Sequence, residues 1–522
     1  MSKEWLVLFI GFACFACRDP SPSKSRAEAG RKHRLIIGTR TEPRTLDPAF
    51  VRRAADQEIV RLLFRDLTDF DDAWTLRPML AERLPQARSS TSGWVVDWKL
   101  RAHLKWSDGR PLTANDIIFG YTVDADPRWP TVNHQDALVV QKMVAVTPQH
   151  LRVFWREGFA GYRAPRVHTV LPAHRYPTPT ADGSRFARLE DKPVSSGPYQ
   201  VERWVSGQQL TLTRNPHWWG PKPEIDTIVF RFLQSEDALE AALLAGTIDA
   251  VGEAGGLSPD RALMLRERLG ADRKVVLTDS AIRLGVELRL DHPALQQREV
   301  RQAMSAVIDR DRFADVAYGG AARAAYGLFP PLHVAHDKAG SPMSLGAAKK
   351  WLAQVDAQSL SLQFASDSKA ARQAAVFLQS RWAEAGLDVR LDGRPFSVLV
   401  DLLSRRAQAP LILLALRMRP DWDGRSVVRS DGRQNYSGYA DSEVDAWIDR
   451  AQTATRAADW RAELQRVEQR YRRDLPSIPL LYRQTVSVRP TLLQGWRPTG
   501  ATTPVTWNAE AWRWSQSGPD VP

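Results

Sequence analysis

Short strand-like runs and amphipathic helical segments alternate along this chain after residue 34, and this alternation constrains the fold more than any other feature. An apolar run at Arg34–Thr39 and a segment with every second residue apolar, Trp94 to Leu100, predict strands. Further strands are predicted at 208–215, 227–233, 359–366 and 409–416, and helices at 235–246, 300–308 and 371–386. The mixture predicts an α/β or α+β fold. Because 522 residues exceed what one core organises, two or more lobes are expected.

The stretch "HLKWSDGRPLTANDIIFGY", at 103–121, specifies its own local structure. Asp108-Gly109 predicts a turn, because aspartate bonds to its own backbone and glycine accepts positive φ. Thr113 is placed to cap a helix, with Asp116 returning a bond to the cap and Leu112 forming a hydrophobic staple with the next turn. Such a cap stabilises a helix by about 1 kcal/mol. The segment therefore predicts strand, turn and helix, without any catalytic group.

The positive net charge of this chain comes from dispersed residues. Seventy-two Lys and Arg face 60 Asp and Glu, for a net charge of +12. The only compact basic run lies at 25–34, beside the N-terminus. A solvated, arginine-rich surface explains this pattern better than a nucleic-acid site, so no nucleic-acid partner is expected.

The N-terminus has the pattern of an export signal. The apolar run Trp5–Ala16 has the length of a signal-peptide core and is too short to span a bilayer. Its end, Phe15-Ala16-Cys17, resembles a bacterial lipoprotein signal, which implies cleavage after residue 16 and lipidation of Cys17. Cys14 is a second candidate, and an ordinary cleaved signal is the alternative. Residues 18–33 are rich in Pro, Ser and charge and are expected to form a disordered tether.

A search for catalytic motifs gives no positive result. The sequence contains no phosphate loop, no dinucleotide fingerprint, no H-E-x-x-H and no nucleophile elbow. His333 and His336 follow Phe329-Pro330-Pro331 and are interpreted as surface loop residues rather than metal ligands. A charged turn explains the acidic cluster from Asp66 to Asp72 better than paired acid–base chemistry. The chain is therefore expected to be no enzyme and to need no cofactor or metal.

Several blocks in order resemble one family, the extracytoplasmic solute-binding proteins of family 5, which serve ABC importers of peptides, nickel and oligosaccharides. The most characteristic are "LFRDLTDF…LRPMLAERL" at 63–84, "VDWKLRAHLKWSDGRPLTANDIIFGY" at 96–121 and "SSGPYQVERWVSGQQLTLTRNPHWWG" at 195–220. "TEPRTLDP", "LEAALLAGTIDA", "AEAGLDVRL", "NYSGYADSEVDAWIDRA" and "YRRDLPSIPLLY" follow the family's order. The resemblance covers roughly residues 34–495.

This resemblance implies a fold and a division of the chain. The expected fold is the α/β, two-lobed periplasmic-binding-protein fold of cluster C type, with mixed sheets and a hinge that the chain crosses twice. Lobe I would comprise 34–285 and the C-terminal return 488–522, with 76–190 as a peripheral subdomain. Lobe II would comprise 286–487. The lobes would close on a ligand by hinge motion.

The resemblance also implies a set of ligand-binding residues. Peptide-binding relatives fix the ligand ammonium with an aspartate in a "W-x-x-D-Y-x-D/E-P"-like segment. In "APLILLALRMRPDWDGRS" an ungapped alignment places Arg419 at that position, and a short shift places Asp421 or Asp423 there. An arginine anchor would favour acidic or neutral ligands. Other positions that match ligand contacts, each with an equally acceptable structural or surface role, are Glu42, Phe119, Tyr121, Phe396 and Arg405.

The leading hypothesis is a monomeric, lipid-anchored binding protein on the periplasmic side of the cell envelope. It would capture peptides or a similar solute and deliver them to an ABC permease in the inner membrane, with a change in Trp fluorescence on closure. A non-peptide solute (a nickel complex, an oligosaccharide or an opine) is the alternative if Arg419 is the anchor. A DNA-binding sensor is disfavoured by the export signal, and an exported hydrolase is the remaining alternative.

Overall fold

The computed structural model describes residues 33–90, 93–129, 131, 133–156, 160–163, 169–176, 192–337, 343–355, 360–501 and 504–515. Within these ranges the main sheet has eleven strands in the order β15-β14-β16-β12-β17-β11-β1-β10-β9-β8, with β13 paired to β17. Its strands are β1 (Arg34–Thr39), β8 (Tyr199–Val205), β9 (Gln209–Arg214), β10 (Thr227–Phe232), β11 (Ala250–Val251), β12 (Arg273–Leu288), β13 (Ala322–Ala324), β14 (Ser361–Ala365), β15 (Arg390–Arg394), β16 (Leu411–Arg417) and β17 (Ser477–Pro490).

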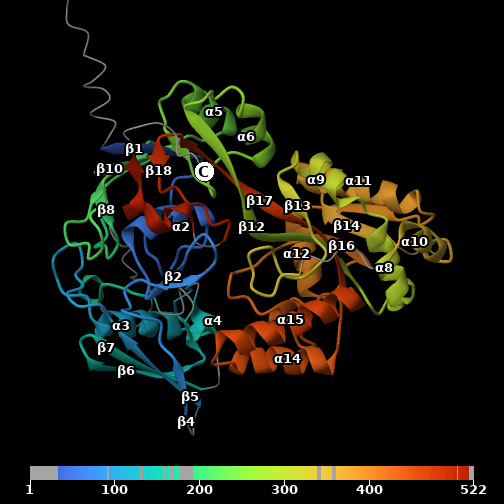
Figure 1. Cartoon of the computed structure of the whole chain (residues 1–522), viewed down its shortest axis with the longest axis horizontal. Helices are drawn as coiled ribbons and strands as arrows, with labels where there is room; N and C mark the ends of the chain where they lie inside the picture. The colour runs from blue at the N-terminus through green and yellow to red at the C-terminus, as the bar shows by residue number, and fades with distance from the viewer. Residues whose placement is uncertain are drawn as a thin grey trace, which may run out of the picture.

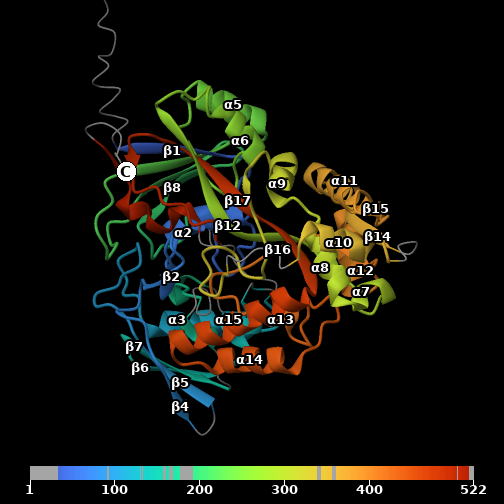
Figure 2. The same cartoon turned by 45° about the vertical axis from the view of Figure 1, so that its right-hand side comes forward.

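The two longest strands join the two halves of this sheet. β12 and β17 pair antiparallel from Arg273↔Pro490 to Glu287↔Ser477, with a register shift between Asp279 and Arg283. Figures 1 and 2 show both strands running from the side of β1 to the side of β16. The crossings predicted near residues 285 and 487 fall inside these two strands. The exact lobe boundaries stay a prediction.

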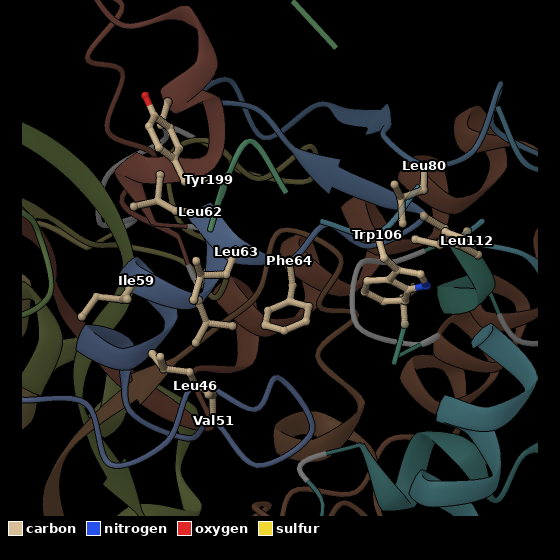
Figure 3. Packing of buried hydrophobic residues seen from close by; sticks show 14 of the residues in the cluster. Leu46, Val51, Ile59, Leu62, Leu63, Phe64, Leu80, Trp106, Leu112 and Tyr199 are labelled. Atoms are coloured by element: carbon tan, nitrogen blue, oxygen red, sulfur yellow. The ribbon is translucent and has the colours of Figure 1, made fainter. Parts of the chain in front are cut away.

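The half of the sheet around β1 is mixed. β1 runs parallel to β10 and β11, whereas β9 is antiparallel to β8 and β10. Its helices are α2 (Ala54–Leu63), α5 (Glu236–Leu244) and α6 (Pro259–Leu265). Figure 3 shows part of the core here, with Ile59, Leu62 and Leu63 from α2 near Leu46 and Val51.

The other half has its own core, built on β14, β15 and β16. β14 is parallel to both β15 and β16. The surrounding helices are α7 (Pro293–Gln296), α8 (Arg298–Ala306), α9 (Arg310–Tyr318), α10 (Leu345–Leu352), α11 (Lys369–Ala383), α12 (Phe396–Ser404), α13 (Arg425–Val428), α14 (Ser442–Thr453) and α15 (Ala457–Asp474). α14 and α15 enclose a separate small apolar cluster with Leu328 and Phe329.

A second sheet lies inside the segment expected to form a peripheral subdomain. Its order is β4-β5-β7-β6, from β4 (Ala87–Ser90), β5 (Gly93–Lys99), β6 (Val140–Thr147) and β7 (His150–Trp155). Beside it lie α3 (Ala114–Ala125) and α4 (His134–Ala137). The predicted capping box is confirmed, because Thr113 accepts from the Asn115 amide at 3.3 Å and Asp116 accepts from the Thr113 amide at 2.8 Å.

The remaining described elements are short. They are the hairpin strands β2 (Thr68–Phe70) and β3 (Leu76–Pro78), the pair β18 (Leu493–Gln494) and β19 (Arg513–Trp514), and the 3₁₀ segments η1 (Ala160–Arg163), η2 (Ala173–Arg175) and η3 (Val505–Ala511). Within the ranges given above, none of the helices combines the length and apolarity that crossing a bilayer requires. The predicted signal and Cys17 lie outside the described residues, as does the predicted tether except for its last residue, His33.

The acidic cluster near residue 70 differs in part from its prediction. Asp71 and Asp72 lie in the turn between β2 and β3, as expected. Asp69, however, is buried in β2, where its carboxylate lies 3.3 Å from the Arg61 guanidinium. Arg61 also binds Asp66 at 2.7 Å. Local sequence could not reveal this ion pair, because it depends on α2 packing over the hairpin.

Candidate ligand-binding site

A cavity of about 900 Å³ lies between two regions that are distant in sequence. The β2–β3 hairpin, Asp136, Gly161 and Arg163 line one side. The segment 419–433 after β16 and the junction between α14 and α15 line the other. Its volume lies in the range of about 300–1,000 Å³ that is typical of small-molecule sites.

The hairpin turn places a tryptophan against the opposite side of the site. Asp71 accepts hydrogen bonds from the amides of Ala73 (3.0 Å) and Thr75 (2.8 Å) and fixes the turn. Trp74 then has a φ of 58°, a left-handed conformation that is costly for a bulky residue. Its ring is buried against Ala281 and Met418. This contact ties the hairpin to β12 and to the residue that follows β16.

The segment after β16 presents an ion pair to the cavity. The Arg419 guanidinium lies 3.2 Å from Asp421 and 3.9 Å from Asp136, which belongs to α4 on the other side. Burial raises the pKa of Asp421, and the neighbouring Arg419 opposes this change. Within the described part of the chain, the buried Oδ2 atom of Asp421 has no hydrogen-bond partner. Asp421 therefore lines the cavity and carries, beneath its surface, one acceptor oxygen that the described residues leave unused.

Asp423 is engaged more fully. Its Oδ1 atom accepts from the Arg425 amide at 3.0 Å, and its Oδ2 atom accepts from Gln452 Nε2 at 2.8 Å. These bonds close the turn that begins α13. Of the three anchor positions considered from sequence, all line the cavity, but only Asp421 combines a carboxylate with an unsatisfied oxygen.

Aromatic rings form the rest of this wall. Trp422 and Trp460 line the cavity, and the imidazole of His333 lies behind them, stacked on Phe329 at 4.3 Å. His333 Nε2 is 2.9 Å from the Trp422 carbonyl, and Nδ1 accepts from the Ala335 amide. Burial lowers the pKa of His333 to about 3, so the ring is neutral and Nε2–H donates. The interpretation of His333 as a surface residue is therefore wrong, because the ring is buried against Phe329, Trp460 and the backbone of Trp422.

Glu42 lies away from the cavity and fixes a hairpin. Its Oε1 atom accepts from Trp204 Nε1 at 2.8 Å, and its Oε2 atom accepts from the Gly207 amide at 2.9 Å. Both carboxylate oxygens therefore hold the turn between β8 and β9. The structure does not bring Glu42 to the residues that line the large cavity.

Phe119 and Tyr121 both pack against neighbouring elements from α3. The Phe119 ring contacts Tyr176 edge-on at a centroid distance of 5.2 Å, in a small cluster with Trp129. Tyr121 packs against the main core, and its hydroxyl donates to the Val140 carbonyl at 3.4 Å. Neither ring lines the large cavity. This is the structural role that the sequence offered for Phe119 and Tyr121 as the alternative to a ligand contact.

Phe396 and Arg405 lie at opposite ends of α12. Phe396 is exposed, and its amide donates to Asp367 Oδ2 at 3.2 Å. Arg405 is exposed and pairs with Asp401 one turn earlier. Neither lines the large cavity. A ligand role for these two residues and for Glu42, Phe119 and Tyr121 stays a prediction.

The sequence did not single out Trp74, Asp136, Trp422 or Trp460, although all four line the cavity. Trp422 carried a usable signal, because it lies between the two candidate aspartates in "PDWDG". The other three come from segments that local patterns place on ordinary turns and helices.

Comparisons with known proteins agree with this architecture. The family model described as "Bacterial extracellular solute-binding proteins, family 5 Middle" matches residues 75–434. Protein XP55 of Streptomyces lividans is 25% identical over 463 residues, covering 84% of this chain and 82% of the relative. The oligopeptide-binding protein AppA of Bacillus subtilis is 22% identical over 529 residues, covering 95% of each. The crystal structure of the ABC transporter substrate-binding protein CtaP of Listeria monocytogenes superimposes with a TM-score of 0.80 at 21% identity, covering 92% of this chain and 99% of CtaP. The predicted fold is thereby confirmed.

Proposed function

The chain belongs to family 5 of the bacterial extracellular solute-binding proteins, and from this premise we propose that it captures peptides in the cavity between its two sides and delivers them to an ABC permease. The family consists of solute-binding components of ABC transporters, which act outside the cytoplasm and are not enzymes. Those parts of the prediction are confirmed by the family match. The peptide specificity is our proposal.

The observation that carries this proposal is Asp421, which lines the 900 Å³ cavity and whose buried Oδ2 atom has no hydrogen-bond partner within the described part of the chain. A ligand ammonium there would form a charge-assisted hydrogen bond, which is about twice as strong as a neutral one. Trp422 and Trp460 supply rigid apolar faces for side chains next to this group. The name of the relative AppA, an oligopeptide-binding protein, supports the same ligand class.

The arrangement of the sheet supports a closing motion. β12 and β17 connect the two sides, and Asp136 and Arg419 form an ion pair between them. Residues 34–285 with 488–522 would move as one lobe, and 286–487 as the other, with the ligand stabilising the closed state. We further propose that the mature chain is a monomer, tethered to the membrane by a lipid on Cys17, with the binding lobes on the periplasmic side.

A non-peptide solute is the second candidate, and one contact favours it. Arg419 lies 3.2 Å from Asp421 and so neutralises part of the charge that an ammonium would use. A neutral or anionic solute, such as an oligosaccharide, an opine or an anionic nickel complex, would not have to compete with this guanidinium.

Native mass spectrometry of the purified chain tests the proposal first, because a ligand carried through purification would be identified directly. Di- to pentapeptides would then be screened by thermal shift and Trp fluorescence. Binding of peptides, with mass analysis showing them uncleaved, supports the proposal. No stabilisation and no fluorescence change with any peptide, together with a bound sugar or metal complex, would refute it.

A further inference from the structure

A second cavity, of about 330 Å³, lies over the middle of the main sheet. Ile282 of β12, Arg417 of β16 and the residues 483–486 of β17 line its floor. Arg40, Ala54, Glu236, the residues 253–254 and 256–259, and Ala501 and Pro504 complete the lining. The lining residues therefore come from both halves of the sheet and from β12 and β17, the two strands that join the halves in Figure 2.

Two arginines flank the centre of this floor. Arg417 lies directly opposite Ile282 in the β12–β16 pair, and Arg483 lies on the other neighbour of β12. All three line the same cavity, so their side chains share one face of the sheet. Strands lie about 4.8 Å apart, so the two arginine backbones are separated by roughly 10 Å. Two long side chains across that distance can converge on one small group above Ile282.

In the part of the chain that the structure describes, neither guanidinium has an acidic partner. Among the described residues, no carboxylate lies within ion-pair distance of Arg417 or Arg483, and neither guanidinium makes a hydrogen bond. The Nε atom of Arg483 is buried without a partner, and its guanidinium lies over the Tyr318 ring at 5.2 Å. Burial and the nearby charge of Arg483 both lower the pKa of Arg417. The two cations therefore repel each other in the unliganded site.

The acidic residues that line the cavity are already engaged. Glu236 binds Arg40 at 3.3 Å and Ser258 Oγ at 2.7 Å. Glu253 accepts from Thr485 Oγ1 at 2.8 Å and from the Gly500 amide at 3.1 Å. Burial raises the pKa of Glu253, which favours its neutral form. The cavity thus contains a surplus of positive charge.

We propose that this cavity is an anion subsite, in which a carboxylate of the solute is held between Arg417 and Arg483. This assignment deepens the proposed function and rests on it for the nature of the solute: the preferred substrates are peptides that carry an acidic residue. A planar guanidinium binds a carboxylate through two parallel N–H bonds, and a second arginine adds a further charge-assisted contact. Binding would also remove the repulsion between the two cations.

The test uses two variants and a matched control. Arg417→Gln and Arg483→Gln each remove one guanidinium from the subsite, and Arg312→Gln removes an exposed arginine of α9 that lies outside it. The probes are alanine-based pentapeptides with Glu or Gln at positions 2 to 5, titrated by calorimetry. We expect the wild type and Arg312→Gln to bind the best Glu peptide at least 10-fold more tightly than its Gln counterpart. Each subsite variant should lose roughly 10- to 100-fold in affinity for the Glu peptide only. Equal preference for Glu in all four proteins would overturn the inference.

A second measurement does not depend on peptides. The melting temperature would be followed against inorganic phosphate at constant ionic strength. The proposal predicts stabilisation by phosphate of the wild type and Arg312→Gln but not of the subsite variants, each compared with its own melting temperature without phosphate. If no peptide binds at all, the proposed function fails, and phosphate stabilisation confined to proteins with both arginines still supports the anion subsite. Absence of stabilisation in the wild type, or equal stabilisation of the variants, counts against it. If phosphate stabilised the wild type but Glu peptides bound no more tightly than Gln peptides, the subsite would bind free anions. The proposal that acidic peptides are the preferred substrates would then be overturned.

Discussion

Replacing Asp421 with asparagine separates the charge of the proposed anchor from its shape. The asparagine side chain would occupy the same space and keep one oxygen acceptor, but it would present no negative charge to a ligand ammonium. Arg419 would retain Asp136 as an ionic partner at 3.9 Å, so the cavity wall would lose one ion pair without leaving a cation isolated. The effect on folding should be small, because burial already disfavours the charged form of Asp421.

The expected loss follows from the type of bond that is removed. A hydrogen bond to a charged partner is worth about 1.5–3 kcal/mol, so peptide affinity should fall roughly 10- to 100-fold. The matched control is Asp423→Asn, because both oxygens of Asp423 are already used by Arg425 and Gln452. That variant should lose less than about 3-fold, or 0.7 kcal/mol.

Calorimetric titration with free and N-acetylated forms of one peptide completes the test. In the wild type, acetylation should weaken binding by the same factor as Asp421→Asn, because both remove the same charge pair. In the variant, acetylation should have no further effect. If acetylation and Asp421→Asn weakened binding additively, or if Asp423→Asn caused the larger loss, Asp421 could not be the ammonium anchor.

Two further predictions concern stability. Burial and the neighbouring Glu253 raise the pKa of Glu58 from 4.5 to about 8, so its contribution to the free energy of unfolding is full below pH 4.5 and is lost as the pH rises through 8. One proton makes this free energy fall by about 1.4 kcal/mol per pH unit, and Glu58→Gln should flatten the fall in denaturant melts. An unchanged slope would refute the assignment. A Cβ on Gly120 would lie 1.9 Å from the Thr169 carbonyl oxygen, so Gly120→Ala should lower the free energy of unfolding by about 1–3 kcal/mol. The control is Gly346→Ala in α10, where a Cβ would meet open space, and this variant should raise the free energy of unfolding by about 0.5–1 kcal/mol. A loss of stability in both variants would argue against the close contact at Gly120.

Strands and helix ends could be predicted because they depend on neighbouring residues. Arg34–Thr39 forms β1 as expected, and every second residue from Trp94 to Leu100 is buried. The helix predicted from residue 235 begins there as α5, with Ser235 capping it by accepting from the Ala238 amide. These features need only periodicity and the chemistry of a cap. They locate elements but not the faces that meet in the folded chain.

The cavity depends on contacts that no local pattern encodes. Trp74 Nε1 donates to the Thr499 carbonyl, 425 residues away in the chain. The anchor could not be chosen from sequence either, because β16 ends at Arg417 and the alternation of side chains ends with it. Three residues within five positions were therefore equivalent candidates. Hydrogen bonds in the folded chain distinguish the two aspartates. Both oxygens of Asp423 accept hydrogen bonds, whereas among the described residues the Oδ2 atom of Asp421 accepts none.

The two proposed contacts with the ligand constrain each other, because they come from one short stretch of chain. Met418 is buried against Trp74, while its neighbours Arg417 and Arg419 line different cavities. The backbone thus passes from the anion subsite to the anchor Asp421 by way of Met418 and Pro420, which are both buried. Four residue steps span at most about 14 Å, which is also the length of roughly four residues of extended peptide. A peptide whose ammonium binds Asp421 can therefore reach Arg417 and Arg483 only with an acidic residue close to its N-terminus. The preference for Glu should accordingly depend on its position along the pentapeptide, which a diffuse attraction to surface arginines would not produce.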